Sequence, residues 1–556
     1  MRRARALSWL LVCLAPLAMA QGEKRIYIAN DDHTDYMWRA DEEAYRQTFL
    51  NMLDYYLDRA DATDNEPSDF QSRFNCDGSF WVWTYEKYKS RAEFQRLIGR
   101  IRSGHIGVPL NPLVICYGGV PAEAVLRSMY YAGSLERRYG MHFPVAISME
   151  NQTLPYGLGA LWAGAGARYS WKGVCACLTQ IDYIYGREHE AYWWVGPDGS
   201  KILMKWNSMV YHGNQGPGGY AEAYDTFGVV DFVDTDPYFQ SIYPYRVIGL
   251  FGKGWDELQT LTDDFVRAAK EMSSPGRRVI VSNELDFFQD FEACYAADLP
   301  TLSCSFGNEW DLYCASMAEV SARVKRSVEK LRTAEAMASI VVTRDPGFMV
   351  GREEARDQAW MNMGLYFEHA WTADGHISKE ARAAWQRRVA AEIEGYVDNL
   401  YADALARMGR MIPAGAFPRF FVFNPLSWER TDYVDLPYEG PFPCAVVDVE
   451  SGQELPSALS TVTGKVRLRV LVAKVPSVGY RVVEVRPGAG TAFSDWARVE
   501  GTTVETSFYR LTLGPNGAIT SLVHKRGGGI ELAGQPGGLN TMPWLARRFG
   551  TRRLGR

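Results

Sequence analysis

The chain has 556 residues, which is too many for one ordinary hydrophobic core, so its length predicts two to four domains. With 47% hydrophobic and 23% charged residues, its composition is that of a globular protein, and 13% of its residues are aromatic, which is a high fraction. The formal net charge is -6 and the body of the chain carries no basic patch, which argues against a nucleic-acid partner.

The first 20 residues have the three parts of a secretory signal peptide. A basic start, MRRARAL, precedes the apolar run SWLLVCLAPLAMA, which ends in the small-x-small site Ala18-Met19-Ala20 before Gln21. No later run is long and apolar enough to span a bilayer. The mature protein is therefore expected to be exported, which means periplasmic or secreted if the source is bacterial.

Residues 21–305 alternate between short apolar runs and amphipathic stretches. The strand-like runs include RIYIAN, HIGVPL, KILMKW, YRVIGLFG and RRVIVS, and the helical stretches include EEAYRQTFLNMLDYYLDRA and TLTDDFVRAAKEM. Strands that alternate with helices predict an α/β domain built on a parallel sheet or barrel. Active sites of such folds lie at the carboxyl ends of the strands.

The segment RIYIANDDHTDYMW, residues 25–38, carries the most informative polar side chains. Its first half predicts a buried strand, and His33 and Asp35 follow where that strand gives way to a loop. Residues two apart in an extended chain point to the same side, so this imidazole and this carboxylate can converge on one metal ion. Trp38 lies within reach and offers an aromatic face to a sugar ring. The alternative is that the two polar residues only cap the next helix and hold a loop.

Two changes in periodicity divide the rest of the chain. Residues 306–412 contain long amphipathic stretches with a helical period, which predict a helical bundle. Residues 413–544 contain short strand-like runs separated by turn residues, which predict a β-sandwich that is only partial. Residues 545–556 form an irregular arginine-rich tail.

The order of these parts, together with five motifs, resembles glycoside hydrolase family 38, the α-mannosidase family. The motifs are HTDYMW, TLPYGLGALWAGAGARY, VKRSVEKLRTAEAMA, FEHAWTADG and VFNPLSWERT, and the resemblance runs from about Arg25 to Trp544. It implies a retaining glycosidase on a seven-stranded β/α domain, followed by a helical bundle and a β region that is truncated here. It further implies an α-mannoside-containing glycan as substrate.

The resemblance also implies a zinc ion held by two histidines and two carboxylates, one of which is the nucleophile. His33 and Asp35 match the first two ligands, and Trp38 matches the tryptophan that stacks on the sugar. His369, in FEHAWTADG, matches the late histidine that closes the metal shell. The chain contains only 8 histidines, so a match at two family positions favours ligands over structural histidines.

The chain departs from the family next to that histidine. The family shows His-His-Asp where this chain has Glu368-His369-Ala370, and Asp374 is a candidate to support the metal shell from outside. Lys172, in ARYSWKGV, is a candidate to steady the nucleophile. The alternative for Lys172 is an ordinary lysine on an exposed turn.

The two catalytic carboxylates are assigned with alternatives. The family places its aspartate nucleophile where this chain reads SMENQTLPYG, so Glu150 is the candidate nucleophile and metal ligand. The alternatives are a loop remodelled around an Asn151 contact and a Glu150 that is only a solvated loop residue. The general acid falls in SFGNEWDLYCAS, where Glu309 is ranked before Asp311, and Trp310 supplies apolar surroundings that raise a carboxyl pKa. Two further carboxylates, for which a structural role is favoured, are Asp77 and Asp290.

Two other functions remain open at this point. A polysaccharide deacetylase-like hydrolase also uses a β/α barrel, a metal ion and a histidine–aspartate set, but activates water for amide or ester cleavage. The helical and β parts that follow the α/β part favour the glycosidase. A catalytically impaired carbohydrate-binding relative is the third interpretation, because the nucleophile segment is altered and the β part is short.

Overall fold

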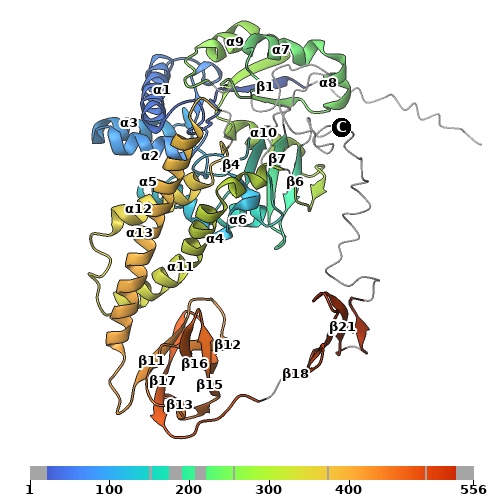
Figure 1. Cartoon of the computed structure of the whole chain (residues 1–556). Helices are drawn as coiled ribbons and strands as arrows, with labels where there is room; N and C mark the ends of the chain where they lie inside the picture. The colour runs from blue at the N-terminus through green and yellow to red at the C-terminus, as the bar shows by residue number, and fades with distance from the viewer. Residues whose placement is uncertain are drawn as a thin grey trace, which may run out of the picture. The chain divides into compact units, whose positions relative to one another are not determined.

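The computed structural model describes residues 22–149, 153–173, 191–206, 221–254, 257–307, 309–371, 375–494, 497–526 and 528–533, without the side chains of residues 309–311. The predicted signal peptide and the arginine-rich tail lie outside these ranges. The chain divides into two units, Met1–Ala406 and Arg407–Arg556 (Figure 1). The first unit combines α/β structure with long helices, and the second holds antiparallel β-sheets. Within the described ranges, no helix combines the length and the apolar character needed to cross a membrane.

The central sheet of the α/β region has three strands, and β1 lies in the middle and pairs in parallel on both sides. The strands are, in order across the sheet, β8 (Val247–Phe251), β1 (Lys24–Ala29) and β9 (Arg277–Ser282). Side chains alternate along β1, so Ile26 and Ile28 face one hydrophobic cluster while Tyr27 and Ala29 face another. Burial on both faces explains why this strand is nearly all apolar, and it fixes the point from which the chain reaches His33.

A second sheet has the strand order β10-β6-β7-β5-β4. Its members are β4 (Val145–Ile147), β5 (Tyr169–Lys172), β6 (Ala191–Val195), β7 (Lys201–Trp206) and β10 (Thr301–Leu302). Strands β6 and β7 form an antiparallel hairpin, and the other neighbours run parallel. A short parallel pair consists of β2 (Phe74–Asn75) and β3 (Ile106–Gly107).

Single hydrogen-bonded contacts connect these sheets. Asp31 forms a parallel bridge with Asn75, and the Leu110 N–H donates to the Val145 carbonyl over 2.8 Å. The described strands of the α/β region lie in sheets of three, five and two strands, where the resemblance implies a seven-stranded domain. The antiparallel β6–β7 pair, joined by a turn closed by residues 196–200, also departs from the parallel pairing that the alternation of strands and helices predicts.

Helices of the α/β region begin and end with standard capping interactions. Asp41 accepts a hydrogen bond from the Ala44 N–H at the start of α1, and Ser90 with Glu93 forms a capping box at the start of α3. Gly140 ends α5 in the left-handed conformation. The helices are α1 (Glu42–Ala62), η1 (Ser68–Phe70), α2 (Ser79–Tyr88), α3 (Arg91–Arg102), η2 (Tyr117–Gly119), α4 (Ala122–Ser128), α5 (Tyr130–Tyr139), α6 (Leu158–Gly164), α7 (Thr226–Thr235), α8 (Pro237–Ile242), α9 (Asp264–Met272) and α10 (Leu285–Tyr295).

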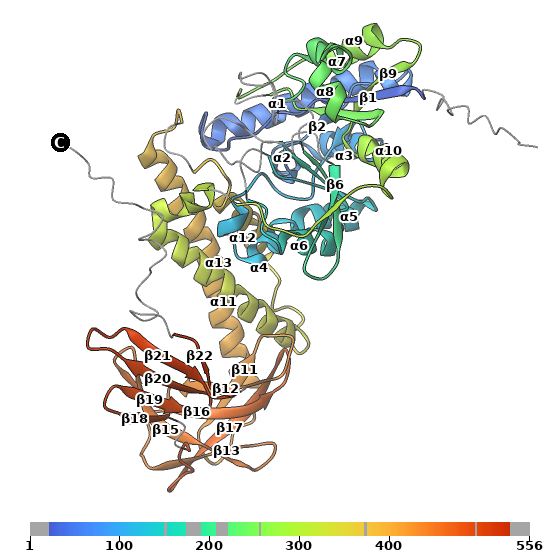
Figure 2. The ribbon, with the colours of Figure 1, turned by 90° about the vertical axis from the view of Figure 1, so that its right-hand side faces the viewer.

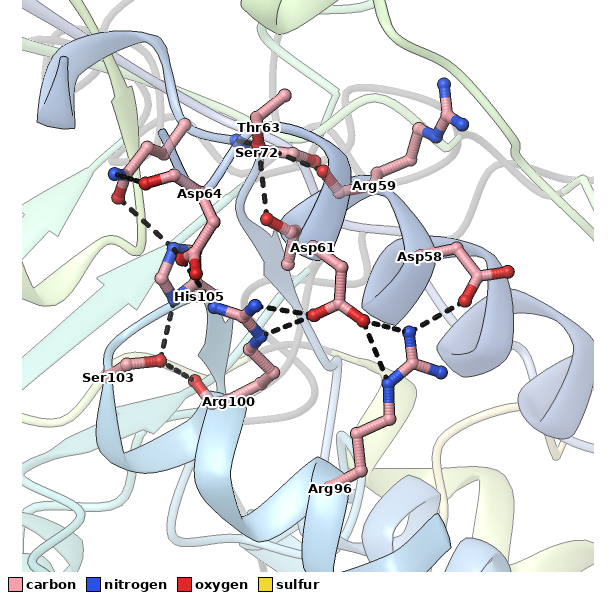
Figure 3. Close-up of polar contacts among 12 residues, drawn as sticks. Asp58, Arg59, Asp61, Thr63, Asp64, Ser72, Arg96, Arg100, Ser103 and His105 are labelled. Carbon is pink, nitrogen blue, oxygen red and sulfur yellow. Dashed lines mark hydrogen bonds and ion pairs between the residues drawn. The ribbon is translucent and has the colours of Figure 1, made fainter. Parts of the chain in front are cut away.

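A network of charged side chains joins α1 to α3 (Figure 3). Asp61 of α1 accepts hydrogen bonds from Nε of Arg96 (3.1 Å) and Nε of Arg100 (2.9 Å) of α3. The same two arginines also bond to Asp58 (2.7 Å) and Asp64 (2.8 Å). All three carboxylates are exposed, so each ion pair by itself contributes little to the stability of the fold. Together the ion pairs connect α3 to α1.

Long helices complete the first unit. They are η3 (Glu309–Met317), α11 (Ala318–Val342), α12 (Glu353–Tyr366) and α13 (Lys379–Met411). Helices α11 and α13 lie side by side (Figure 2), joined by an ion pair between Arg323 and Glu394. Just before α13, the His376 N–H donates to the Trp38 carbonyl over 2.9 Å. The start of α13 therefore lies against the turn that follows β1.

The β-sheets of the second unit are antiparallel. Two of them share one hydrophobic core, to which Leu436, Val446, Val470 and Val485 contribute, as in a sandwich. The first has the order β11 (Arg419–Asn424), β17 (Gly479–Pro487), β13 (Cys444–Asp448), β14 (Glu454–Leu455), and the second has the order β12 (Arg430–Leu436), β16 (Lys465–Val475), β15 (Ser457–Val462). A further sheet consists of β18 (Ala497–Glu500), β19 (Thr503–Thr506), β20 (Tyr509–Leu513), β21 (Ile519–His524) and β22 (Ile530–Glu531).

Candidate metal centre

Three side chains from two distant segments meet beyond the carboxyl end of β1. Nε2 of His33 lies 3.2 Å from Nε2 of His369 and 3.6 Å from Oδ1 of Asp35. Nε2 of His369 lies 2.9 Å from the same carboxylate oxygen. Both imidazoles are buried, and 11% of the Asp35 side chain is exposed. These three residues, which the sequence motifs assign to one site, could together hold a metal ion.

The turn that carries His33 and Asp35 is fixed by hydrogen bonds to α2 and to Asp77, two residues before that helix. The Thr34 N–H donates to Oδ2 of Asp77 over 2.8 Å, and Nε1 of Trp81 donates to Oγ1 of Thr34 over 3.1 Å. The Thr34 side chain thus bonds to Trp81, whereas the side chains on either side of it, His33 and Asp35, lie in the cluster. This is the i, i+2 relation expected of an extended chain.

His369 reaches the cluster from the end of α12. The Cys116 N–H donates to the Phe367 carbonyl over 2.8 Å, and the His369 N–H donates to the Val114 carbonyl over 3.2 Å. These two hydrogen bonds hold residues 367–369 as a short extended segment along residues 114–116. The backbone of His369 is therefore fixed by the α/β region.

A carboxylate lies behind each imidazole. Nδ1 of His369 lies 2.9 Å from Oε1 of Glu368, and Nδ1 of His33 lies 3.5 Å from Oδ2 of Asp77. Both carboxylates are fully buried. Metal-binding histidines commonly donate their second ring N–H to such an acceptor, which leaves the other nitrogen for the metal.

The two aspartates of this region have opposite pKa shifts. Burial alone would raise the pKa of Asp35, but hydrogen bonds and charge interactions with His33 and His369 outweigh burial and hold this pKa well below its usual range. Burial raises the pKa of Asp77 to about 7, although His33 and the Thr34 N–H act in the opposite direction. Asp35 is therefore ionised at neutral pH and can accept a cation.

The donor geometry suits a divalent metal ion. Ligand atoms at about 2.0–2.1 Å from a tetrahedral zinc ion are about 3.3 Å apart. The three donor separations of 2.9, 3.2 and 3.6 Å bracket that value. Two imidazole nitrogens with one carboxylate form a donor set that zinc and related ions accept, and a fourth position is left for a further ligand.

Several predicted site residues lie outside the described part of the structure. Glu150 and Asp374 are among the residues that the structure does not describe. Glu309, Trp310 and Asp311 form the backbone of the start of η3, but their side chains are not described. Their predicted roles as nucleophile, general acid and substrate contacts remain predictions.

Three other candidates are described. Trp38 is half-buried, and its ring packs edge-on against His376 with the centroids 5.6 Å apart. Lys172 is the last residue of β5 and only 2% exposed, so it does not lie on an exposed turn. Asp290 accepts hydrogen bonds from Arg25 (2.6 Å) and Tyr27 (2.9 Å), which supports its structural role.

Two contributors to the site were missed in the sequence. Glu368 was noted only as a departure from the family pattern, although its place beside His369 was a usable signal. Arg382, on α13, lies with Nη2 3.1 Å from Oε2 of Glu368, and no spacing or motif connects it to the histidine. Asp77 was considered and assigned a structural role, and its carboxylate lies 3.5 Å from Nδ1 of His33.

Glu284 is a further buried carboxyl group, located just after the carboxyl end of β9. It is 6% exposed and adopts a left-handed backbone conformation, with φ of 61°. Burial and the negative charge of Asp77 raise the pKa of Glu284 to about 8, against the influence of Lys205. The folded protein therefore keeps a proton on Glu284 at a pH at which the unfolded chain has released it.

Because the folded protein keeps this proton on Glu284, we expect the protein to lose stability as the pH rises from about 4.5 to about 8. Glu284→Gln mimics the protonated form, so the difference in unfolding free energy between this variant and the wild type should grow over that interval by on the order of 1 to 4 kcal/mol. Thermal and urea unfolding at a series of pH values measure it. A difference that stays constant across the interval would show that Glu284 does not keep its proton on folding.

Comparison with known proteins gives a match only at the level of structure. No protein-family model matches the sequence, and the curated proteins give no match either. An α-mannosidase from Enterococcus faecalis V583 matches with a TM-score of 0.64 and 16% identity, over 92% of this chain and 62% of that chain. A protein in glycosyl hydrolase family 38 from Enterococcus faecalis matches with a TM-score of 0.59 and 15% identity, over 92% of this chain and 60% of that chain.

This chain thus spans about three fifths of the length of the two structures that it matches. The aligned part includes almost the whole of this chain, from the α/β region through the long helices to the β-sheets. At this level of identity the match concerns the fold. The chain therefore shares the fold of this α-mannosidase and of this protein in glycosyl hydrolase family 38, as its motifs indicated.

Proposed function

We propose that this protein is an exported, metal-dependent retaining glycoside hydrolase that acts on α-mannosides. The observation that carries the proposal is the convergence of His33, Asp35 and His369 in a fold similar to that of an α-mannosidase. A buried pair of imidazoles with an ionised carboxylate is chemically suited to a divalent cation, and zinc is the ion we propose. The signal-like first 20 residues support export.

In the proposed reaction, two carboxyl groups work on opposite sides of the glycosidic bond. The carboxylate of Glu150 attacks the anomeric carbon, while a protonated carboxyl group, Glu309 or Asp311, donates its proton to the departing oxygen. The same acid, now ionised, then takes a proton from water, which attacks the anomeric carbon and releases Glu150. When bound, zinc supplies a Lewis acid that polarises hydroxyl groups of the sugar.

Other residues have supporting roles in the proposal. Trp38 stacks against the sugar ring, and Trp310 provides apolar surroundings for the general acid. Lys172 lies at the carboxyl end of β5, the edge at which active sites of such folds form, and its ammonium group stabilises the nucleophile carboxylate. Asp374 supports the metal-binding histidine from outside.

The test is hydrolysis of 4-nitrophenyl α-D-mannopyranoside by the purified chain. We expect turnover that is lost after dialysis against a chelator and returns with added zinc. A fluorinated mannosyl fluoride should trap the glycosyl–enzyme, and peptide mapping should locate the label on Glu150. Release of acetate from an acetylated polysaccharide, without nitrophenol release, would favour the deacetylase. Glycan binding without any turnover would favour the impaired relative.

A further inference from the structure

Glu368 is buried between the candidate metal ligand His369 and the guanidinium group of Arg382, on helix α13. One carboxylate oxygen, Oε1, lies 2.9 Å from Nδ1 of His369 and accepts the Tyr36 N–H over 3.3 Å. The other, Oε2, accepts from Nη2 of Arg382 and from the Ala370 N–H, each over 3.1 Å. Each oxygen of Glu368 therefore faces two partners, and the carboxylate can adopt few other orientations.

The side chain of Arg382 is also held by several contacts. It lies in the first turn of α13 and is 5% exposed, and its second terminal nitrogen, Nη1, donates to the Tyr36 carbonyl. Its guanidinium group also stacks over the Trp385 ring, 4.8 Å from the ring centroid. Ser378 fixes this turn, because its carbonyl accepts the Arg382 N–H over 2.9 Å.

The charges explain why these two residues occur together. A buried carboxylate without a cation is strongly unfavourable, and Arg382 compensates the charge of Glu368. The compensated carboxylate lies 2.9 Å from Nδ1 of His369, and its negative charge favours a proton on that nitrogen, which leaves the lone pair of Nε2 for Asp35, His33 and the metal. On the other imidazole, the carboxylate of Asp77 lies farther away, 3.5 Å from Nδ1 of His33.

We propose that Glu368 and Arg382 are positioning residues that hold His369 in the tautomer and orientation required for metal binding, so that helix α13 takes part in retaining the metal. This inference rests on the proposed metal-dependent function and deepens it. It predicts that metal affinity depends on Arg382, a residue of helix α13 that contacts neither metal nor substrate.

The test measures zinc affinity by competition with a chromogenic chelator. Glu368→Gln, Arg382→Gln and Arg382→Lys should each weaken zinc binding by about 10- to 100-fold, the effect typical of residues that orient metal ligands. Arg388→Gln is the matched control, because Arg388 lies on the same helix, is half-exposed and pairs with Glu42 away from the cluster. It should bind zinc as the wild type does. Melting temperatures in the presence of a chelator show whether each variant is folded.

A double variant separates positioning from folding. Glu368→Gln with Arg382→Gln leaves no buried charge uncompensated, so its melting temperature should recover relative to Arg382→Gln. Under the proposal its zinc affinity nevertheless stays low, because the neutral amide that replaces the carboxylate is a weaker acceptor for the imidazole. Recovery of zinc affinity in the double variant, or wild-type affinity in the single variants, would overturn the inference and leave the proposed function standing. A wild-type protein that binds no zinc would overturn both.

Discussion

Replacing His369 with alanine is expected to abolish metal retention and, with it, glycoside turnover. Of the two imidazoles, that of His369 supplies the donor atom closer to Asp35, at 2.9 Å. Loss of a direct ligand should weaken metal binding by more than about 100-fold, because loss of an outer residue already costs about 10- to 100-fold. Metal content after dialysis, measured by mass spectrometry, checks the expectation, and His33→Ala should behave in the same way.

His142 provides a matched control for these two variants. Its side chain is 58% exposed and pairs with Glu136 at 2.8 Å, and it precedes the amino end of β4, whereas the cluster lies beyond the carboxyl end of β1. His142→Ala should keep wild-type metal content and turnover. A His369→Ala protein that is folded and still carries one metal ion per chain would rule out the proposed shell.

The local part of the site could be read from the sequence. An apolar run that ends in a polar loop predicts a buried strand, and two-residue spacing predicts that His33 and Asp35 share a side; both features occur in the structure. His369 could be assigned only through the resemblance, because 336 residues of chain separate it from His33. The assignment needed a motif, since no local pattern encodes so distant a contact.

Other features were beyond local patterns or were overlooked. The β6–β7 hairpin was overlooked, although Gly196 and Gly199 within AYWWVGPDGSKILMKW are a turn signal of the kind that joins antiparallel strands. The Arg382 contact with Glu368 was beyond reach, because an amphipathic helix gives no indication of which arginine turns inward. Tertiary packing decides that choice.

Lys205 illustrates the same point inside the α/β core. In the strand β7, positions 201, 203 and 205 share one face, and Leu203 lies in the hydrophobic core, so Lys205 points inward as well. Its ammonium group lies 2.8 Å from Oε2 of Glu222, and the two side chains are 3% and 0% exposed. Burial lowers the pKa of Lys205, while the charge of Glu222 opposes that shift.

Lys205→Met is expected to lower the free energy of unfolding by about 3–5 kcal/mol, because it removes the ammonium group that lies 2.8 Å from the buried carboxylate of Glu222. Glu222→Gln in the same chain should restore most of this loss, since the amide oxygen still accepts the Phe251 N–H that Glu222 accepts over 2.8 Å. Urea unfolding followed by tryptophan fluorescence measures both effects.

The exposed pair of Lys330 with Asp398 is the control for this prediction. Its two side chains are 36% and 60% exposed, so Lys330→Met should change the free energy of unfolding by less than about 1 kcal/mol. Equal effects of the two lysine substitutions would contradict the argument, because they would show that burial adds nothing to the cost of an unpaired carboxylate. A double variant no more stable than Lys205→Met alone would show instead that the lysine acts through packing on Phe251, whose ring centroid lies 4.6 Å from its ammonium nitrogen.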